Sequence, residues 1–234
     1  MHNVGCLNCK NNLCIRKVSV FNTLEYEDML EIARMIGHRE YKKGEFLCHE
    51  GDKTSMLFVV NSGKVKLSKF NIEGKEQILN IISDGEIFGE YYLFMDFEPY
   101  NFSAIALTDV KICTLVKQDM DYILLKYPKI SHKILQEVSK KMIGAENLAQ
   151  NLSTINTDSK VHYVLKELAQ KYGTEHEKKI RLELPITREE MANYAGVTRE
   201  TMSRKLSALE QEGIIETVGN KIIIINDIEY LEDY

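Results

Sequence analysis

Short runs in which apolar and polar residues alternate fill the first half of the chain, from about residue 41 to residue 116. Val65 and Leu67 belong to one run, and Ile78 and Ile82 belong to another. Glycine turns separate the runs, in the segments KKGEF, HEGDK, NSGKV, IEGKE and SDGEI. Strands of this length with turn signals at this spacing predict a compact all-β sandwich or roll.

Helical periodicity occurs on both sides of this β-rich region. Before it, NTLEYEDMLEIARMI (residues 22–36) predicts a short amphipathic helix with Asn22 or Thr23 as its N-cap. After it, residues 118–153 predict a long helix with six apolar positions at spacings of three and four. We call these positions the seam: Leu135, Val138, Met142, Ala145, Ala149 and Leu152.

The seam has the heptad pattern of a two-stranded coiled coil. An amphipathic helix that packs on its own domain produces a similar pattern. Ala145 and Ala149 are small and allow two helices to approach closely. We therefore expect a homodimer.

Residues 154–234 have the pattern of a separate helical domain. DSKVHYVLKELAQKYG predicts a helix that ends at Gly173. Thr187 and Glu190 form a capping-box pattern that opens a short helix, and Gly196 follows in a tight turn.

The next helix and a hairpin complete a motif. Thr198 is the expected N-cap of this helix, and Gly213 ends it. IIETVGNKIIII predicts a β-hairpin with Gly219 and Asn220 at its tip. Helix, glycine turn, helix and hairpin in this order predict a winged helix-turn-helix.

The second helix of this motif has an apolar and a polar face. Met202, Leu206 and Leu209 share the apolar face, which we expect to pack into the domain. The expected DNA-binding residues are Thr198, Arg199, Glu200, Ser203 and Arg204, and Ser207 lies on the same face. Arginine can bond guanine bidentately and glutamate can accept from cytosine. A Glu–Arg pair four residues apart is also an ordinary surface salt bridge, but the capped turn and the hairpin favour DNA binding.

Composition narrows the class of protein. The 234 residues suffice for two domains, and 44% hydrophobic and 28% charged residues are typical of globular proteins. No run approaches the roughly 18 apolar residues of a membrane span, and MHNVGCLNCKNN lacks the apolar stretch of a signal peptide. We therefore expect a cytoplasmic protein without a membrane partner. The net charge of −5 argues against non-specific coating of nucleic acid.

No enzyme class is indicated by the sequence. It contains no glycine-rich phosphate loop, no nucleophile–histidine arrangement and no carboxylate pair in a plausible cleft. We therefore expect a protein that is not an enzyme.

Cysteines crowd the start of the chain, in CLNCKNNLC. Cys6, Cys9 and Cys14 are three of the five cysteines, and clustered thiols in a reducing compartment bind metal or do redox chemistry more often than they form structural disulfides. Zinc completed by Cys113 or a histidine is one alternative, and a reversible disulfide is another. Cys48 is a reserve ligand or disulfide partner.

The order of these elements resembles the CRP/FNR superfamily of bacterial transcription regulators. TRETMSRKL is similar to the family's recognition helix, LCHEGDKTSMLFVVNSGKVKL to its first β-roll hairpins, and DGEIFGEYYLF to its ligand-pocket segment. The resemblance implies an α+β fold with RNA polymerase as a partner. The expected parts are a cysteine-rich segment (1–16), a β-roll of the cyclic-nucleotide-binding, double-stranded β-helix type (17–117), a long dimerisation helix (118–153) and the winged helix-turn-helix (154–234).

The residues of the ligand pocket can be compared with those of relatives that bind cyclic AMP. Relatives that bind cyclic AMP carry a Gly-Glu pair for the ribose and an arginine before a Ser/Thr-Ala step for the phosphate. This chain keeps Gly89-Glu90 and Ser103, but Phe102 stands in the arginine's place, and no arginine or lysine lies between Lys75 and Lys111. A buried phosphate needs a paired cation, so we expect a degenerate pocket that binds no cyclic nucleotide. Tyr91 and Tyr92 are expected to add bulk there.

The N-terminal cysteines are similar to those of the FNR branch, which carries an oxygen-labile [4Fe–4S] cluster. The resemblance implies Cys6, Cys9, Cys14 and Cys113 as its four thiolate ligands, with a spacing one residue shorter than the commonest pattern of that branch. It implies a regulator that responds to oxygen, nitric oxide or redox state. A thiol-based regulator, or one that responds to haem (with His2 or His49 as ligand) or to another small effector, is the alternative.

Two further expectations concern assembly and the operator. Proteins of the FNR branch tend to carry an acidic residue on the seam, which keeps the cluster-free protein monomeric. This chain has Ala145 at the matching position, so we expect a dimer even without a cluster. Glu200 and Arg204 match residues that both branches use on a TGA core, whereas Arg199 resembles the CRP branch and Ser203 the FNR branch. The expected operator is a palindrome with TGA/TCA cores.

Overall fold

The computed structural model describes residues 14–53, 55–95, 98–177, 179–227 and 230, with no description of the Cys14 and Ile15 side chains. Cys6, Cys9 and His2 therefore lie outside the described residues. The chain forms two compact units, one of residues 1–69 and 80–144 and one of residues 70–79 and 145–234. The domain boundaries expected from the sequence remain predictions.

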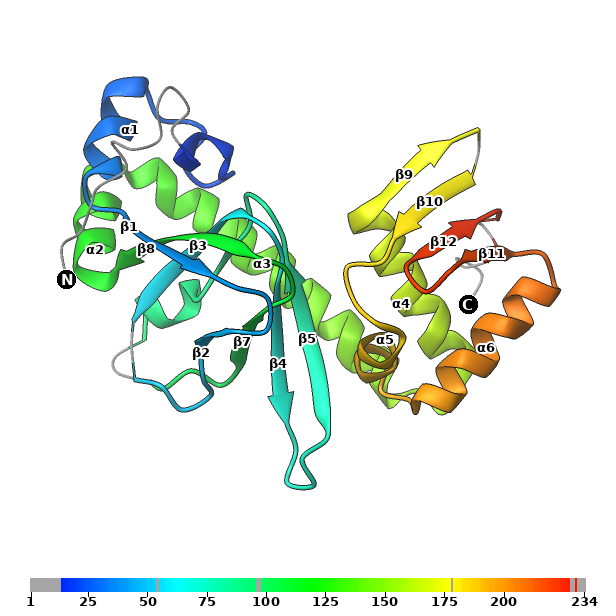
Figure 1. Ribbon diagram of the computed structural model, residues 1–234. Helices are drawn as coiled ribbons and strands as arrows, with labels where there is room; N and C mark the ends of the chain where they lie inside the picture. The colour runs from blue at the N-terminus through cyan, green and yellow to red at the C-terminus, as the bar shows by residue number, and fades with distance from the viewer. Residues whose placement is uncertain (1–13, 54, 96–97, 178, 228–229, 231–234) are drawn as a thin grey trace. The chain divides into compact units, whose positions relative to one another are not determined.

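The first half of the chain is a β-roll of two four-stranded sheets (Figure 1), as the glycine-punctuated pattern predicts. The sheets have the strand orders β1-β8-β3-β6 and β2-β7-β4-β5. The strands are β1 (Gly37–Tyr41), β2 (Phe46–Cys48), β3 (Met56–Ser62), β4 (Val65–Phe70), β5 (Glu76–Ile82), β6 (Ile87–Phe88), β7 (Ser103–Ala106) and β8 (Val110–Val116).

The helix before the roll is shorter than predicted. α1 spans Tyr26–Ala33, and its N-cap is Glu25 without a side-chain cap hydrogen bond, so the expected cap at Asn22 or Thr23 is wrong. Phe21, which is 0% exposed, packs in the roll's core. The backbone N–H of Leu24 donates to the carbonyl of Phe21 (3.1 Å), so a turn precedes the helix where the periodicity predicted its first residues. A short 3-10 helix, η2 (Cys14–Lys17), precedes it.

The segment predicted as one long helix contains two. α2 spans Lys117–Lys126 and α3 spans Pro128–Ser153, with Tyr127 between them at φ −125° and ψ 72°. Proline disfavours helical geometry in the residue before it and fits the first turn of the following helix, so Pro128 ends one helix and opens the next. Ile130 and Ile134 then bury the start of α3 against the roll.

The C-terminal domain is a winged helix-turn-helix, as predicted. The capping box of Thr187 and Glu190, the left-handed turn at Gly196 (φ 65°) and the N-cap at Thr198 are all present. Its elements are α4 (Thr157–Tyr172), β9 (Gly173–His176), β10 (Lys179–Glu183), α5 (Arg188–Ala195), α6 (Arg199–Gln211), β11 (Ile215–Val218) and β12 (Ile222–Ile225).

The sheet of this domain is larger than the predicted hairpin. β9 and β10 form a second hairpin, and β10 pairs with β12 to give the order β11-β12-β10-β9. The sequence analysis missed β9 and β10, since the polar segment GTEHEKKIRLE has only a weak strand pattern. Among the described residues, no helix is both long and apolar enough to cross a membrane.

Candidate functional site

α6 is held in place by its apolar face and by its N-cap. Met202, Leu206 and Leu209 are 0–4% exposed and pack into the domain. The Thr198 hydroxyl accepts a hydrogen bond from the backbone N–H of Thr201 at 3.2 Å. The first turn of α6 therefore has a fixed position relative to the rest of its domain.

The opposite face of α6 is polar. Thr198, Arg199, Glu200 and Arg204 are exposed, and Ser203 is half-buried. Apart from Thr198, these side chains form no hydrogen bond or ion pair with any residue that the structure describes, and the possible Glu200–Arg204 salt bridge is not formed. Their donors and acceptors are thus available to the edges of DNA bases.

Two polar contacts that the sequence did not indicate fix α6 further. Lys205 forms an ion pair with Asp158 of α4 (Nζ–Oδ1 2.5 Å). The Glu210 carboxylate accepts hydrogen bonds from the backbone N–H (2.9 Å) and the hydroxyl (2.7 Å) of Thr217 in β11. These two bonds lower the pKa of Glu210 from its ordinary value. They join the recognition helix to the wing.

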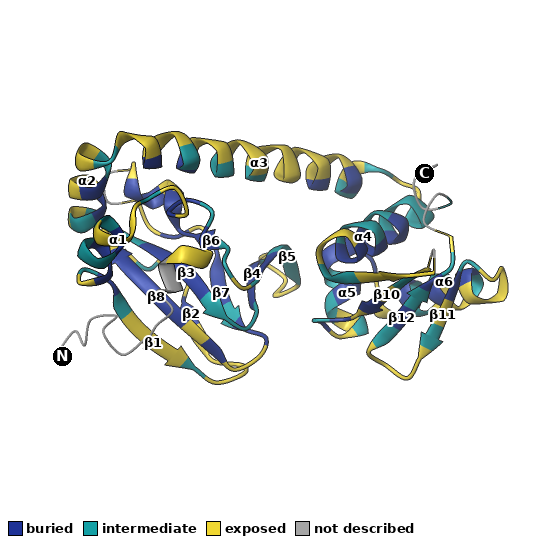
Figure 2. Cartoon of the chain, turned by 90° about the horizontal axis from the view of Figure 1, so that it is seen from above, coloured by how far each residue is buried: buried dark blue, intermediate teal, exposed yellow. Residues whose placement is uncertain are grey.

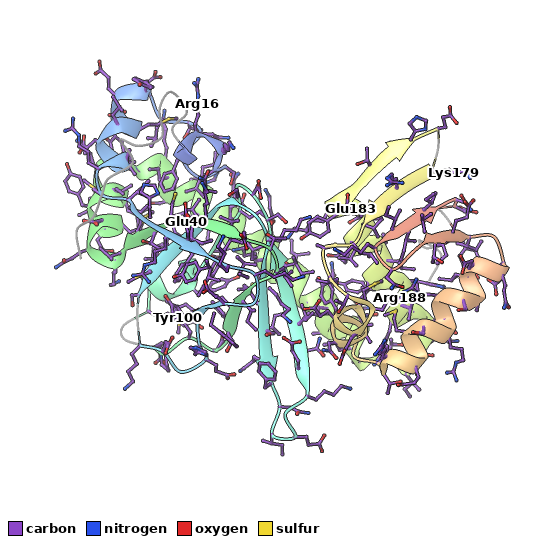
Figure 3. All side chains as sticks on the ribbon, viewed as in Figure 1. Arg16, Glu40, Tyr100, Lys179, Glu183 and Arg188 are labelled. Carbon is purple, nitrogen blue, oxygen red and sulfur yellow. The ribbon has the colours of Figure 1, made fainter. Side chains whose placement is uncertain are left out.

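Five buried aromatic rings pack together in the β-roll. Phe58 stacks on Phe88 (4.6 Å between centroids), Tyr100 meets Tyr92 edge-on (4.7 Å), and Tyr100 stacks on Phe102 (5.5 Å). Tyr100 is labelled in Figure 3, and all five residues are at most 5% exposed. Phe102, singled out by the sequence, is therefore one member of a packed aromatic cluster.

The other expected pocket residues have specific neighbours. The Ser103 hydroxyl accepts a hydrogen bond from the backbone N–H of Glu50 (3.1 Å). Tyr92 is buried as expected, but Tyr91 is 40% exposed and adds no bulk inside.

Gly89 has φ 84°, and a Cβ there would lie 2.5 Å from the carbonyl oxygen of Met56. Only glycine fits this turn, which brings Glu90 into the interior at 0% exposure.

A lysine from far along the chain meets that carboxylate. The Lys141 ammonium, carried by α3, lies 2.6 Å from Oε1 of Glu90. The two residues are 51 positions apart. No local sequence pattern could have indicated this pair.

Cys113 is the one expected metal ligand whose side chain is described. It lies in β8 at 2% exposure, and its Sγ is 3.5 Å from Nδ1 of His38 in β1. It shares a core cluster with Val18, Val20 and Phe21, which follow the cysteine-rich segment. Among the residues that the structure describes, no three His, Cys, Asp or Glu side chains are grouped to hold a metal ion.

The reserve ligand Cys48 has a different environment. Burial raises the pKa of its thiol to about 12. The thiolate that metal binding or disulfide exchange requires is therefore strongly disfavoured at this position.

The seam is only partly covered within one chain, and much of α3 is exposed (Figure 2). Leu135 and Met142 are 62% and 61% exposed. Ala145 and Ala149 are also exposed. Val138, however, packs against the core of the roll.

The last seam position has a neighbour in its own unit. Leu152 is half-buried beside Gly196, where an added Cβ would lie 2.6 Å from its Cδ2 atom. The chain thus uses part of the seam for its own packing.

A β-roll followed by a long helix and a winged helix-turn-helix with an exposed polar recognition face defines a DNA-binding regulator with a sensor domain. The profile of the cyclic nucleotide-binding domain matches residues 38–127, and that of the Crp-like helix-turn-helix domain matches residues 159–234. The probable transcriptional regulator flp of Lacticaseibacillus casei is 31% identical over 221 residues, which cover 94% of this chain and 97% of that protein. The chain belongs to the CRP/FNR family of transcription regulators.

One further relative is named for its effector, and one solved structure shares the fold. The CRP-like cAMP-activated global transcriptional regulator of Mycobacterium tuberculosis is 26% identical over 217 residues, which cover 93% of this chain and 96% of that one. A CooA mutant from Carboxydothermus hydrogenoformans has the same fold, with a TM-score of 0.77 at 23% identity and coverage of 96% and 95% of the two chains.

Proposed function

We propose that this protein is a homodimeric transcription regulator, without enzymatic activity, that binds a palindromic operator with TGA/TCA cores. The observation that carries the proposal is the face of α6, where Arg199, Glu200, Ser203 and Arg204 carry no intramolecular hydrogen bond or ion pair within the described chain. Glu200 and Arg204 are the proposed readers of the TGA core, and Thr198, Arg199 and Ser203 contact the flanking positions. The bound dimer acts through RNA polymerase.

A gel shift on an inverted TGA repeat tests operator binding. Arg204→Ala removes one base-reading side chain, so it should weaken specific binding by about 1–3 kcal/mol. Arg39→Ala is the matched control, because Arg39 is also exposed but lies in β1 of the sensor unit. Unchanged operator affinity in Arg204→Ala would contradict the proposed docking.

The dimer forms through the seam in this proposal. Leu135 and Met142 leave a large apolar area exposed in the single chain, and burial of apolar area is the main driving force of association. A symmetric dimer presents two recognition helices to half-sites roughly 34 Å apart, which matches a palindromic operator. The absence of an acidic residue at Ala145 supports a dimer that persists without a cluster.

We further propose that the signal is read by a [4Fe–4S] cluster held by Cys6, Cys9, Cys14 and Cys113. The described residues fit this assignment in two respects. η2, which begins at Cys14, packs against β3, the strand that pairs with β8 at Cys113. Val18, Val20 and Phe21 anchor the chain after the motif in the core that contains Cys113.

The cluster would supply redox chemistry and sensitivity to oxygen or nitric oxide. The chain's own contribution is to couple the N-terminal segment to the core of the roll. Loss of the cluster would then release Cys113 from that segment and alter packing beside α1 and α3. This coupling is the proposed route from signal to operator binding.

Iron and acid-labile sulfide per chain, measured in protein purified without oxygen and after exposure to air, test the cofactor. The expected result is about four of each per subunit, lost in air and in Cys113→Ser. Cys48→Ser is the matched control and should keep the cluster, because its thiol is buried with a raised pKa. One zinc without sulfide would make the site structural, and the absence of metal would favour a disulfide switch; either outcome contradicts the cluster.

We propose that cyclic nucleotides are not the effector. The aromatic cluster around Tyr100 occupies the interior of the roll, and Phe102 offers no cation to a phosphate. Titration calorimetry with cyclic AMP should show no binding heat, and saturable binding would contradict the proposal.

A further inference from the structure

The Glu90 carboxylate is the most deeply buried acidic group in the described part of the sensor unit. Its side chain is 0% exposed, while the Lys141 side chain opposite it is 18% exposed. The Lys141 ammonium donates to Oε1 of Glu90 at 2.6 Å and to the backbone carbonyl of Ile87 at 2.5 Å. Oε2 of Glu90 has no hydrogen-bond partner within the described chain.

Because the Glu90 side chain is buried, its charge needs a partner inside the protein. An ionised carboxylate that has lost its water needs a compensating charge, and removal of one member of a buried pair leaves the other uncompensated. The chain has no arginine or lysine between Lys75 and Lys111, so the pocket segment cannot neutralise Glu90 by itself. The compensating charge comes from α3.

The ion pair lies on the same face of α3 as the apolar contacts of this helix with the roll. Ile130, Ile134 and Val138 pack into the core of the roll, and Lys141 continues this face by one more turn. Met142, the next residue along the helix, lies about 100° further around the helix axis and is 61% exposed. The Lys141–Glu90 pair adds a charged contact one turn beyond Glu137, whose carboxylate accepts a hydrogen bond from the Ser19 hydroxyl at 3.2 Å.

We propose that Lys141 takes the role of an effector. Its ammonium neutralises the buried Glu90 carboxylate and holds α3 in the orientation that presents the seam to a second copy of the chain. Lys141 is thus a positioning residue for dimerisation and, through it, for operator binding. The proposal rests on the dimeric regulator proposed above. It is independent of the iron–sulfur cluster.

The test uses the full-length protein and measures the dimer dissociation constant, operator affinity and thermal midpoint separately. Lys141→Met should weaken dimerisation and operator binding by about tenfold or more, and Lys141→Arg, which keeps the charge, should recover most of both. Lys140→Met is the matched control, because the neighbouring Lys140 side chain is 72% exposed and pairs with Glu137 of its own helix at 3.2 Å. It should leave all three quantities unchanged.

The double variant Glu90→Gln/Lys141→Met separates positioning from stability. It leaves no buried charge, so its thermal midpoint should recover towards the wild type while its dimer affinity stays about tenfold weaker. If Lys141→Met does not fold, the double variant alone tests the role of Lys141 in dimerisation. Wild-type dimer affinity in the double variant, or equal effects of Lys140→Met and Lys141→Met, would overturn the proposal.

Failure of this inference is distinguishable from failure of the proposed function. If the wild-type protein dimerises but does not bind the inverted TGA repeat, the operator proposal is wrong, whereas the dimer constants still decide the role of Lys141. If the wild-type protein is monomeric, both are wrong.

Discussion

Leu135→Ala is the sharpest test of the dimer, because Leu135 is 62% exposed in the single chain and lies on the seam. Full burial of a leucine side chain contributes about 1.5–3 kcal/mol, so the exposed part accounts for about 1–2 kcal/mol per copy. Alanine retains little of this, and a symmetric dimer loses it twice. The expected loss is therefore about 2–3 kcal/mol, which weakens dimerisation about 30- to 150-fold.

Sedimentation equilibrium over a concentration series, on cluster-free protein, measures this change. Leu125→Ala is the matched control: Leu125 is the same residue type and is more exposed at 84%, but it lies on α2 rather than on the seam. The control should dimerise like the wild type. A wild-type dissociation constant in Leu135→Ala, or an equal loss in both variants, would refute the assignment of the seam as the dimer contact.

Three further predictions concern the fold that supports the site. Thr187→Ala removes the side-chain cap of α5 and should destabilise the protein by about 1 kcal/mol in urea unfolding. Gly89→Ala should cost about 2 kcal/mol or more in the same assay, because φ is 84° and the new Cβ would lie 2.5 Å from the Met56 carbonyl oxygen. Hydrogen bonds from Thr217 lower the pKa of Glu210 below its ordinary 4.5, so this carboxylate stabilises the fold above that pH and the contribution is lost as the pH falls through the lower folded value. The thermal-midpoint difference between wild type and Glu210→Gln should therefore shrink on acidification.

Each of these predictions has a result that contradicts it. Wild-type stability of Thr187→Ala would mean that the cap bond contributes nothing. Full stability of Gly89→Ala would mean that the turn before Glu90 relaxes freely. A difference between wild type and Glu210→Gln that is the same at every pH would remove Glu210 from the acid-sensitive contacts.

Local signals in the sequence were sufficient for most elements. The capping box at Thr187, the left-handed turn at Gly196 and the hairpin tip at Gly219 are each decided by residues within a few positions of one another. The recognition helix follows the same rule, since its apolar and polar faces are set by helical spacing. Such features depend on backbone geometry and short-range hydrogen bonds, which the sequence encodes directly.

The predicted helix bounds were wrong at a turn and at a proline, and the seam prediction did not anticipate that the chain itself covers one position. A turn between Phe21 and Leu24 shortened α1, and Pro128 divided the segment predicted as one helix. Val138 follows the heptad spacing, yet it packs on the roll of its own chain. A heptad pattern marks an apolar stripe but does not say which surface covers each position.

The sequence by itself determined the order of the parts and the caps and turns of the DNA-binding domain. Tertiary structure alone decided that Tyr100 stacks on Phe102, that Lys141 forms an ion pair with Glu90, and that His38 lies beside Cys113. The last two pairs join residues 51 and 75 positions apart. Each pair forms because the fold buries two distant segments of the chain together. The periodicity within one segment does not indicate such a contact.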